Sequence, residues 1–216
     1  MKSAIFDLDG VIVDTAKFHY FAWKQIAQKL NYKLTIVQNE KLKGISRKDS
    51  LGLLLKWSGR HLSGIEFNNL LIAKNSLYLD QIKNITNEDS LPGINKTLEF
   101  FKREGVKIAL GSASKNSKIV LNKLSLIHFF DTIIDGNDVI NSKPNPEVFI
   151  KGAKSLGVPN SDCIVFEDSI AGIKAAKLAM MDAIGICEPN QNLKHTILNI
   201  KSFLEIEPTN LIKYFK

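Results

Sequence analysis

Apolar side chains recur at two different spacings along this chain, and the spacings divide it into regions. Over residues 16–88 they return every three or four positions, as at Phe18, Ala22 and Ile26. That spacing is typical of one face of a helix. The helices predicted in this region cover residues 16–30, 47–57 and 63–83. Because no strand pattern interrupts the region, we expect it to be all-helical.

Short apolar runs alternate with helical segments in the rest of the chain. The runs typical of buried strands cover residues 4–6, 106–112, 132–135, 163–168 and 183–187. The helical segments cover residues 94–103 and 116–124, the stretch after Pro146 up to Leu156, and residues 170–179. The tail is predicted to hold one more strand and a short helix after Thr209. This alternation predicts an α/β fold with a parallel sheet covered on both faces.

Polar side chains follow several of the predicted strands. They are Asp7 and Asp9, Ser112 and Ser114, Lys143, and Glu167 with Asp168. In a parallel sheet of this kind the ligand site lies beyond the carboxyl ends of the strands. We therefore expect these side chains to meet at one edge of the sheet.

The first of these groups is a pair of aspartates, Asp7 and Asp9, followed by Gly10. Alternate side chains of a strand point the same way, and two close carboxylates repel unless a cation or a shared proton lies between them. Taken alone, the pattern is equally consistent with a simple Asp-Gly turn. The polar residues at the other strand ends favour a chemical role.

The set as a whole combines several carboxylates with one lysine and one or two serines. Excess carboxylates predict a divalent cation bound through oxygen, most simply Mg²⁺. An aspartate can attack a phosphoryl group and form an aspartyl-phosphate, while lysine and serine stabilise the phosphoryl oxygens. A second aspartate can protonate the leaving oxygen and later deprotonate the incoming one.

Composition narrows the class of protein without changing this hypothesis. The 216 residues are 44% hydrophobic, enough for one domain with a sizeable insertion. The formal charge of +7 comes from scattered lysines, and it lacks the basic stripe with interleaved aromatic residues expected for nucleic-acid binding. Cys163 and Cys187 lie in apolar surroundings, which indicates buried free thiols in a reducing compartment. We expect a cytoplasmic monomer without a signal peptide, a membrane partner or a nucleic-acid partner.

Four segments of the chain together resemble the motifs of the haloacid dehalogenase superfamily, in the same order. They are FDLDGVIVDT after Ile5, SAS at 112–114, the SKP lysine Lys143, and FEDS at 166–169. The resemblance implies a Rossmann-like, doubly wound, mainly parallel core at 1–15 and 89–216, with an all-helical cap domain at 16–88. It implies Asp7 as nucleophile, Asp9 as general acid and base, and Ser112 and Lys143 as phosphoryl-positioning groups. It also implies that Asp7, Asp9, Glu167 and Asp168 hold Mg²⁺.

Within that superfamily the insertion is similar to that of the β-phosphoglucomutases. The similarity rests on LKGISRKDSL at 42–51, SASKN at 112–116, AKN at 73–75, His19 and Trp23. It implies that Arg47 binds the distal phosphate of the substrate, that His19 assists Asp9, and that Thr15 lies at a hinge. The implied substrate-binding residues are Trp23, Gly44, Ser46, Arg47, Ser50, Lys74, Ala113, Ser114, Lys115 and Asn116.

The activity implied by this resemblance is a mutase that acts on a phosphorylated hexose. It would interconvert β-D-glucose 1-phosphate and glucose 6-phosphate through glucose 1,6-bisphosphate and an aspartyl-phosphate. A sugar-phosphate phosphatase with the same core residues is the nearest alternative, and a phospho-accepting signalling domain is a remote one. The second aspartate, Asp9, argues against the dehalogenase branch, whose reaction has no alkoxide leaving group to protonate.

Overall fold

A parallel sheet forms the centre of the molecule in the computed structural model, which describes residues 2–188 and 193–215. In the described residues the sheet has six strands in the order β3-β2-β1-β4-β5-β6, all parallel. The strands are β1 (Ser3–Phe6), β2 (Lys107–Gly111), β3 (Thr132–Ile134), β4 (Cys163–Glu167), β5 (Asp182–Ile186) and β6 (Leu198–Ile200). The chain runs outward from β1 to β3 and then restarts at β4 on the other side. The strand order therefore reverses between β1 and β4, where ligands bind in sheets of this kind.

Helices cover both faces of this sheet. Neighbouring side chains of a strand point to opposite faces, so the apolar residues of β1 need to be buried on both. Phe6 lies in a core with residues of α5 (Ile94–Arg103), α6 (Ser117–Lys123) and α9 (Pro208–Leu211). Ile5 lies in a second core with residues of α7 (Glu147–Leu156) and α8 (Ile170–Leu178). The rings of Phe6 and Phe166, neighbours across β1 and β4, stack with centroids 4.5 Å apart.

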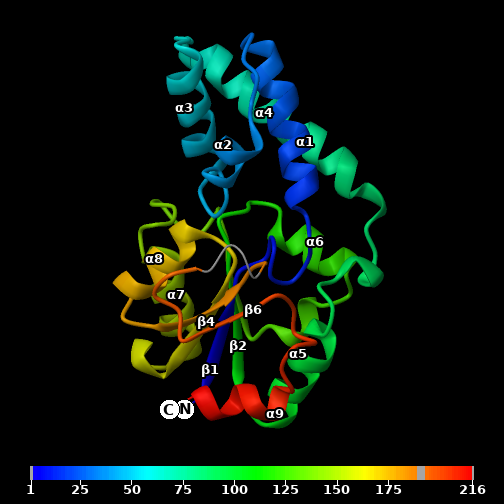
Figure 1. Cartoon of the computed structure of the whole chain (residues 1–216), viewed down its shortest axis with the longest axis vertical. Helices are drawn as coiled ribbons and strands as arrows, with labels where there is room; N and C mark the ends of the chain where they lie inside the picture. Colours follow the sequence, from blue (N-terminus) through cyan, green and yellow to red (C-terminus); the bar gives the residue numbers. More distant parts are fainter. Residues whose placement is uncertain (1, 189–192, 216) are drawn as a thin grey trace.

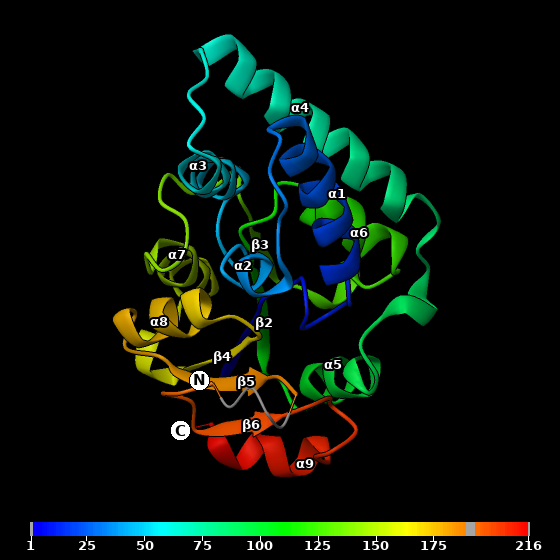
Figure 2. The ribbon, with the colours of Figure 1, turned by 45° about the horizontal axis from the view of Figure 1, so that its top comes forward.

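The remaining helices form a separate layer above the carboxyl ends of the strands (Figures 1 and 2). They are α1 (Ala16–Lys29), α2 (Ile36–Glu40), α3 (Arg47–Ser58) and α4 (Gly64–Gln81). This helical layer has its own apolar core, which includes Trp23, Ile26, Leu51 and Leu54. Short 3₁₀ helices also occur at Ile82–Asn84, Asn87–Asp89, Ile127–Phe129, Asn160–Asp162 and Ile212–Tyr214.

Two chain segments connect the sheet to the helical layer, and they lie side by side. Val13 on the outgoing segment bridges Ser90 on the returning one, and the Leu91 amide donates to the carbonyl of Ile12 at 2.8 Å. The helical layer is therefore joined to the sheet by a narrow double connection.

The predicted fold class is confirmed, with two local differences. The sequence analysis missed α2, whose Ile36 and Val37 are 70% and 72% exposed and so form no buried apolar face. Cys163 is a buried free thiol as expected, whereas Cys187 is free but only partly buried. None of the helices described is both long and apolar enough for a membrane span.

Candidate active site

Three buried charged side chains form the floor of the site at the ends of β1 and β4. The pairing of Phe6 with Phe166 places the next residues, Asp7 and Glu167, beside each other. Lys143 comes from the loop before α7, and its Nζ donates to Asp7 Oδ1 and to Glu167 Oε2, both at 2.8 Å. These interactions are strengthened because all three side chains are almost fully shielded from water.

Glu167 is held at both of its carboxylate oxygens. Ser169 donates to Glu167 Oε1 from its hydroxyl at 2.7 Å and from its amide at 3.1 Å. The Ser169 hydroxyl in turn accepts from the amide of Gly172 at 3.0 Å. Glu167 is thus fixed between Lys143 and the start of α8, with little freedom to turn.

A third carboxylate, Asp168, completes an acidic cluster at this edge. Asp7, Glu167 and Asp168 each place one oxygen within 4.8 Å of the others. Burial raises the pKa of Asp7 to about 7, against the effect of Lys143 and with that of Glu167 and Asp9. Burial and the charges of Glu167 and Asp7 also raise the pKa of Asp168 well above its usual value.

Burial is the largest cause of both pKa shifts, and repulsion between the neighbouring carboxylates raises both pKa values further. Lys43 from the helical layer is the other nearby cation, with Nζ 3.8 Å from Asp168 Oδ2. A hard divalent cation prefers carboxylate oxygens and would relieve this repulsion. The residues present therefore fit a Mg²⁺ site.

Gly10 allows the turn after β1 to pass directly beside Asp168. Its φ of +82° lies in the left-handed region, and a Cβ there would stand 2.3 Å from Asp168 Oδ2. A larger residue would therefore displace the carboxylate as well as strain the backbone. The Asp-Gly turn considered in the sequence analysis is present, and it is part of the site.

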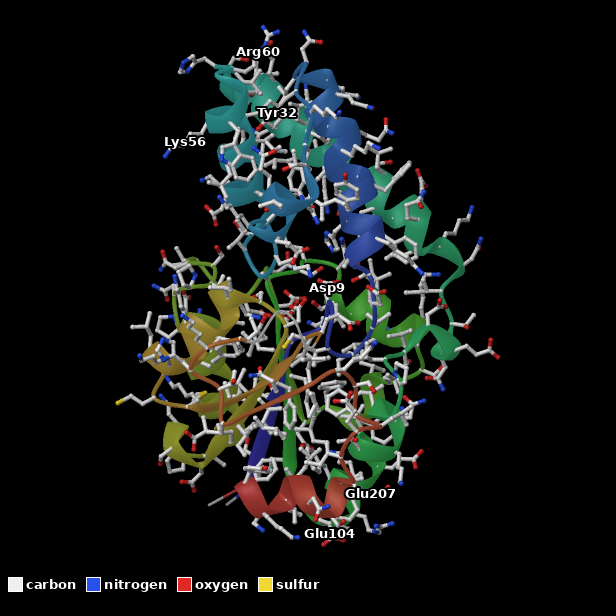
Figure 3. The ribbon with its side chains drawn as sticks, in the orientation of Figure 1. Asp9, Tyr32, Lys56, Arg60, Glu104 and Glu207 are labelled. Carbon is white, nitrogen blue, oxygen red and sulfur yellow. The ribbon has the colours of Figure 1, made fainter. Side chains whose placement is uncertain are left out.

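Asp9 lies where the helical layer meets the sheet (Figure 3). The hydroxyl of Thr15 donates to Asp9 Oδ1, and His19 Nε2 lies 3.4 Å from the same oxygen. Burial alone would raise the pKa of Asp9, but His19, Thr15 and Lys74 lower it below its usual value. In the described residues the Asp9 carboxylate is not part of the acidic cluster, and its contacts with Thr15 and His19 suit proton transfer.

Lys74 on α4 is buried in the helical layer next to His19. Its Nζ lies 2.8 Å from His19 Nδ1, 5.2 Å from the ring centroid of Trp23 and 4.8 Å from that of Tyr78. The ring of His19 also packs against that of Tyr78 at a tilt, with centroids 4.2 Å apart. Aromatic rings thus take the place of water around the ammonium group of Lys74.

The pKa values of Lys74 and His19 are both shifted downwards. Burial and the charge of Arg47 lower the pKa of Lys74 to about 7, against the effect of Asp9. Burial and the charge of Lys74 lower the pKa of His19. An anion bound here would favour the protonated form of Lys74.

Arg47, at the start of α3, is held by neutral partners. Its Nη2 donates to Asn75 Oδ1 at 2.7 Å, and its Nη1 lies 3.5 Å from the carbonyl oxygen of Leu71. The same Asn75 oxygen accepts from Asn116 Nδ2 on the sheet side at 2.8 Å. In the described residues no carboxylate forms an ion pair with Arg47, so its charge is available to an anion.

The loop after β2 supplies hydroxyl and amide groups to the same space. Ser112 is fully buried, and its hydroxyl oxygen accepts from the amide of Ser114 at 3.1 Å. The hydroxyl hydrogen of Ser112 therefore remains available to a phosphoryl oxygen. Gly44 of the helical layer lies close to the start of α8, because a Cβ on it would stand 2.2 Å from Ser169 Oγ.

These groups surround one cavity of about 340 Å³ between the sheet and the helical layer. Every substrate-binding residue predicted from the sequence lines it, as do Asp7, Asp9, His19, Ser112 and Asp168. Lys143 and Glu167 are not among the lining residues, but Lys143 contacts the lining residue Asp7 and also Glu167. The lining residues not selected from the sequence include Asn39, Lys43, Val139, Ile140 and Ser142. Ser142 was the easiest of these to find, because it directly precedes Lys143.

Comparison with known proteins gives consistent results. A sequence model described as haloacid dehalogenase-like hydrolase matches residues 4–186. The chain is 42% identical over 188 residues to a β-phosphoglucomutase of Bacillus subtilis (strain 168), covering 86% of this chain and 83% of the relative. It is 27% identical over 217 residues to a phosphorylated carbohydrates phosphatase of Thermotoga maritima, covering 99% and 94%. A crystal structure of β-phosphoglucomutase from Clostridium difficile has a TM-score of 0.94 at 40% identity, covering 99% and 96%.

Proposed function

Because the chain belongs to the haloacid dehalogenase-like hydrolase family, we propose that it is a β-phosphoglucomutase that interconverts β-D-glucose 1-phosphate and glucose 6-phosphate. The observation that carries this proposal is the unneutralised Arg47 in the same cavity as Asp7. A sugar bisphosphate has two phosphates, one for the reacting carboxylate and one for a separate cation. The planar guanidinium of Arg47 suits the second task because it binds phosphate through two hydrogen bonds.

In the first half-reaction, phosphorylated Asp7 passes its phosphoryl group to the 6-hydroxyl of β-glucose 1-phosphate. The new bond joins phosphorus to the hydroxyl oxygen, and the bond between phosphorus and the Asp7 oxygen breaks. Asp9 takes the hydroxyl proton, with Thr15 and His19 fixing its carboxylate. The products are glucose 1,6-bisphosphate and a free Asp7 carboxylate.

In the second half-reaction, the bisphosphate has turned end for end and Asp7 attacks the phosphorus at position 1. Asp9 returns its proton to the departing sugar oxygen, so glucose 6-phosphate leaves and Asp7 is phosphorylated again. Lys143 and Ser112 stabilise the phosphoryl oxygens in both directions. Turning requires the helical layer to loosen between the half-reactions.

Mg²⁺ fits the cluster of Asp7, Glu167 and Asp168. When bound, it supplies positive charge that favours the ionised form of Asp7 and offsets the charge of the phosphoryl oxygens. Lys143 supplies the same kind of stabilisation from the protein itself, and burial by its neighbours keeps it in place.

A sugar-phosphate phosphatase is the second candidate, and the similarity to the Thermotoga maritima phosphatase over 99% of the chain favours it. The two activities use the same Asp7 and Asp9. They differ only in whether a sugar hydroxyl or water accepts the phosphoryl group.

A single incubation separates the two activities. The protein is mixed with Mg²⁺, β-glucose 1-phosphate and a trace of β-glucose 1,6-bisphosphate, and glucose 6-phosphate and free phosphate are measured together. We expect glucose 6-phosphate to dominate, and the Asp7→Asn variant, purified in the same way, controls for contaminating enzymes. Dominant release of phosphate would make the protein a phosphatase.

A further inference from the structure

Asp49 on α3 makes a hydrogen bond from the helical layer to the sheet side. Its Oδ2 accepts from the hydroxyl of Ser46 and from the hydroxyl of Ser142, both at 2.5 Å. Ser46 is the residue before α3, whereas Ser142 lies 93 positions away in the loop that leads into α7. Figure 2 shows this loop reaching up to the start of α3.

The start of α4 offers a direct comparison within the same layer. There Ser63 caps the helix, and Glu66 accepts from the Ser63 amide and hydroxyl, both at 2.8 Å. Glu66 therefore closes a local capping box. Asp49 occupies the same third position after Ser46 but has a side chain one methylene shorter, and its oxygen also receives Ser142. Among the described residues, the hydrogen bonds of Glu66 stay within the start of α4, whereas Asp49 at the start of α3 also contacts the sheet side.

Ser142 connects Asp49 with the residues that take part in the reaction. It lines the cavity, and it directly precedes Lys143, whose Nζ contacts Asp7. Asp49 is exposed and does not itself line the cavity. Any effect of Asp49 on the reaction therefore travels through Ser142 or through the position of the helical layer.

We propose that Asp49 is a positioning residue whose hydrogen bond to Ser142 holds the helical layer closed over phosphorylated Asp7. We call this contact the Asp49–Ser142 latch. Closing a site excludes bulk water and keeps the substrate in place. The latch therefore favours transfer of the phosphoryl group to a sugar hydroxyl over transfer to water. This role rests on the mutase activity proposed above, because both reactions start from the same aspartyl-phosphate.

The test compares Asp49→Ala, Ser142→Ala and the double variant with the wild type. Glu66→Ala is the matched control, because it removes a capping acid from the same layer without touching the sheet side. Thermal unfolding first establishes that all variants are folded. The ratio of glucose 6-phosphate formed to phosphate released is then measured with Mg²⁺, β-glucose 1-phosphate as the phosphoryl acceptor and a trace of β-glucose 1,6-bisphosphate.

We expect the ratio to fall about fivefold in each single latch variant, which is the scale of one net hydrogen bond. The double variant should fall no further, because both changes break the same contact. Glu66→Ala should keep the wild-type ratio. Equal ratios in Asp49→Ala and Glu66→Ala, or additive losses in the double variant, would overturn the latch.

Small-angle X-ray scattering tests closure independently of the sugar chemistry. With Mg²⁺ present, the radius of gyration should increase in Asp49→Ala and Ser142→Ala but not in Glu66→Ala. Unchanged radii in both latch variants would contradict the proposal even if the ratios change. If the wild type makes no glucose 6-phosphate, the mutase proposal fails while the scattering result still decides the latch.

Discussion

The two sides of the cavity carry opposite charge. The sheet side places three carboxylates, those of Asp7, Glu167 and Asp168, around Lys143. The helical side contributes mainly cations and neutral donors, with Arg47 and Lys74 among the residues that line the cavity. The like charges on each side therefore repel one another, and each side attracts an occupant of the opposite charge.

The pKa values express this difference in chemical terms. On the sheet side, burial raises the pKa of Asp7 to about 7. On the helical side, burial lowers the pKa of Lys74 to about 7. A cation on the sheet side and a phosphate on the helical side would each restore the ordinary charge. A metal-bound phosphoryl group and a second, metal-free phosphate match these two sides.

The largest expected effect is on the sheet side. Asp7→Asn removes the nucleophile, so turnover of every phosphate ester should fall by about 10⁴-fold or more. Steady-state rates with β-glucose 1-phosphate and with 4-nitrophenyl phosphate measure this loss. Asp14→Asn, an exposed aspartate on the same connection, is the control and should keep its rate. A loss smaller than about tenfold in Asp7→Asn would remove it from the nucleophile role.

A smaller and selective effect is expected on the helical side. Arg47→Ala should lower kcat/KM for β-glucose 1-phosphate by about 100-fold, because a doubly hydrogen-bonded, charge-assisted contact to the distal phosphate is lost. Hydrolysis of 4-nitrophenyl phosphate, which has no distal phosphate, should change less than about threefold.

Lys56→Ala controls for the loss of one positive charge from the same helix. Its side chain lies at the outer side of the helical layer, away from Asp9 (Figure 3), and it is exposed. If Arg47→Ala lowers kcat/KM equally for both substrates, Arg47 does not bind the distal phosphate.

The smallest expected effect is a change in pH dependence. Lys74 has a pKa lowered to about 7 in the free protein, so its ammonium loses a proton as the pH rises above that value. We expect kcat/KM for the anionic substrate to fall about tenfold between pH 7 and pH 8.5. Lys74→Arg stays charged throughout, so its profile should lack this fall. A fall of the same size in Lys74→Arg would assign the titration to another group.

The residues on the sheet side could be predicted from the sequence, because a parallel sheet places the carboxyl ends of its strands next to one another. Asp7, Lys143 and Asp168 each follow or lie next to a predicted strand end, and parallel pairing brings those ends together. Lys74 has no such local signal. Its side chain is buried only because Trp23 and Tyr78, on two helices, pack around it. The family resemblance selected it, whereas helical periodicity would have left it on the surface.

Two other features were beyond a reading of the sequence for related reasons. The short α2 helix exposes Ile36 and Val37, so the apolar periodicity that marks the other helices is absent. Asn75 was noticed within the AKN segment, but its role depends on Arg47 and Asn116 meeting at one oxygen. This shared acceptor depends on how the helical layer packs on the sheet, which local sequence patterns do not specify.

Thr15 connects the two sides in a way that bears on protein engineering. As the residue before α1 it makes no side-chain cap for that helix, and its hydroxyl instead donates to Asp9. His19, one turn further along, also faces Asp9. A helical layer transplanted from a relative would therefore bring new partners for the proton-transfer group along with new substrate contacts. Chimaeras that aim to change only specificity should keep residues 15–19 of the recipient chain.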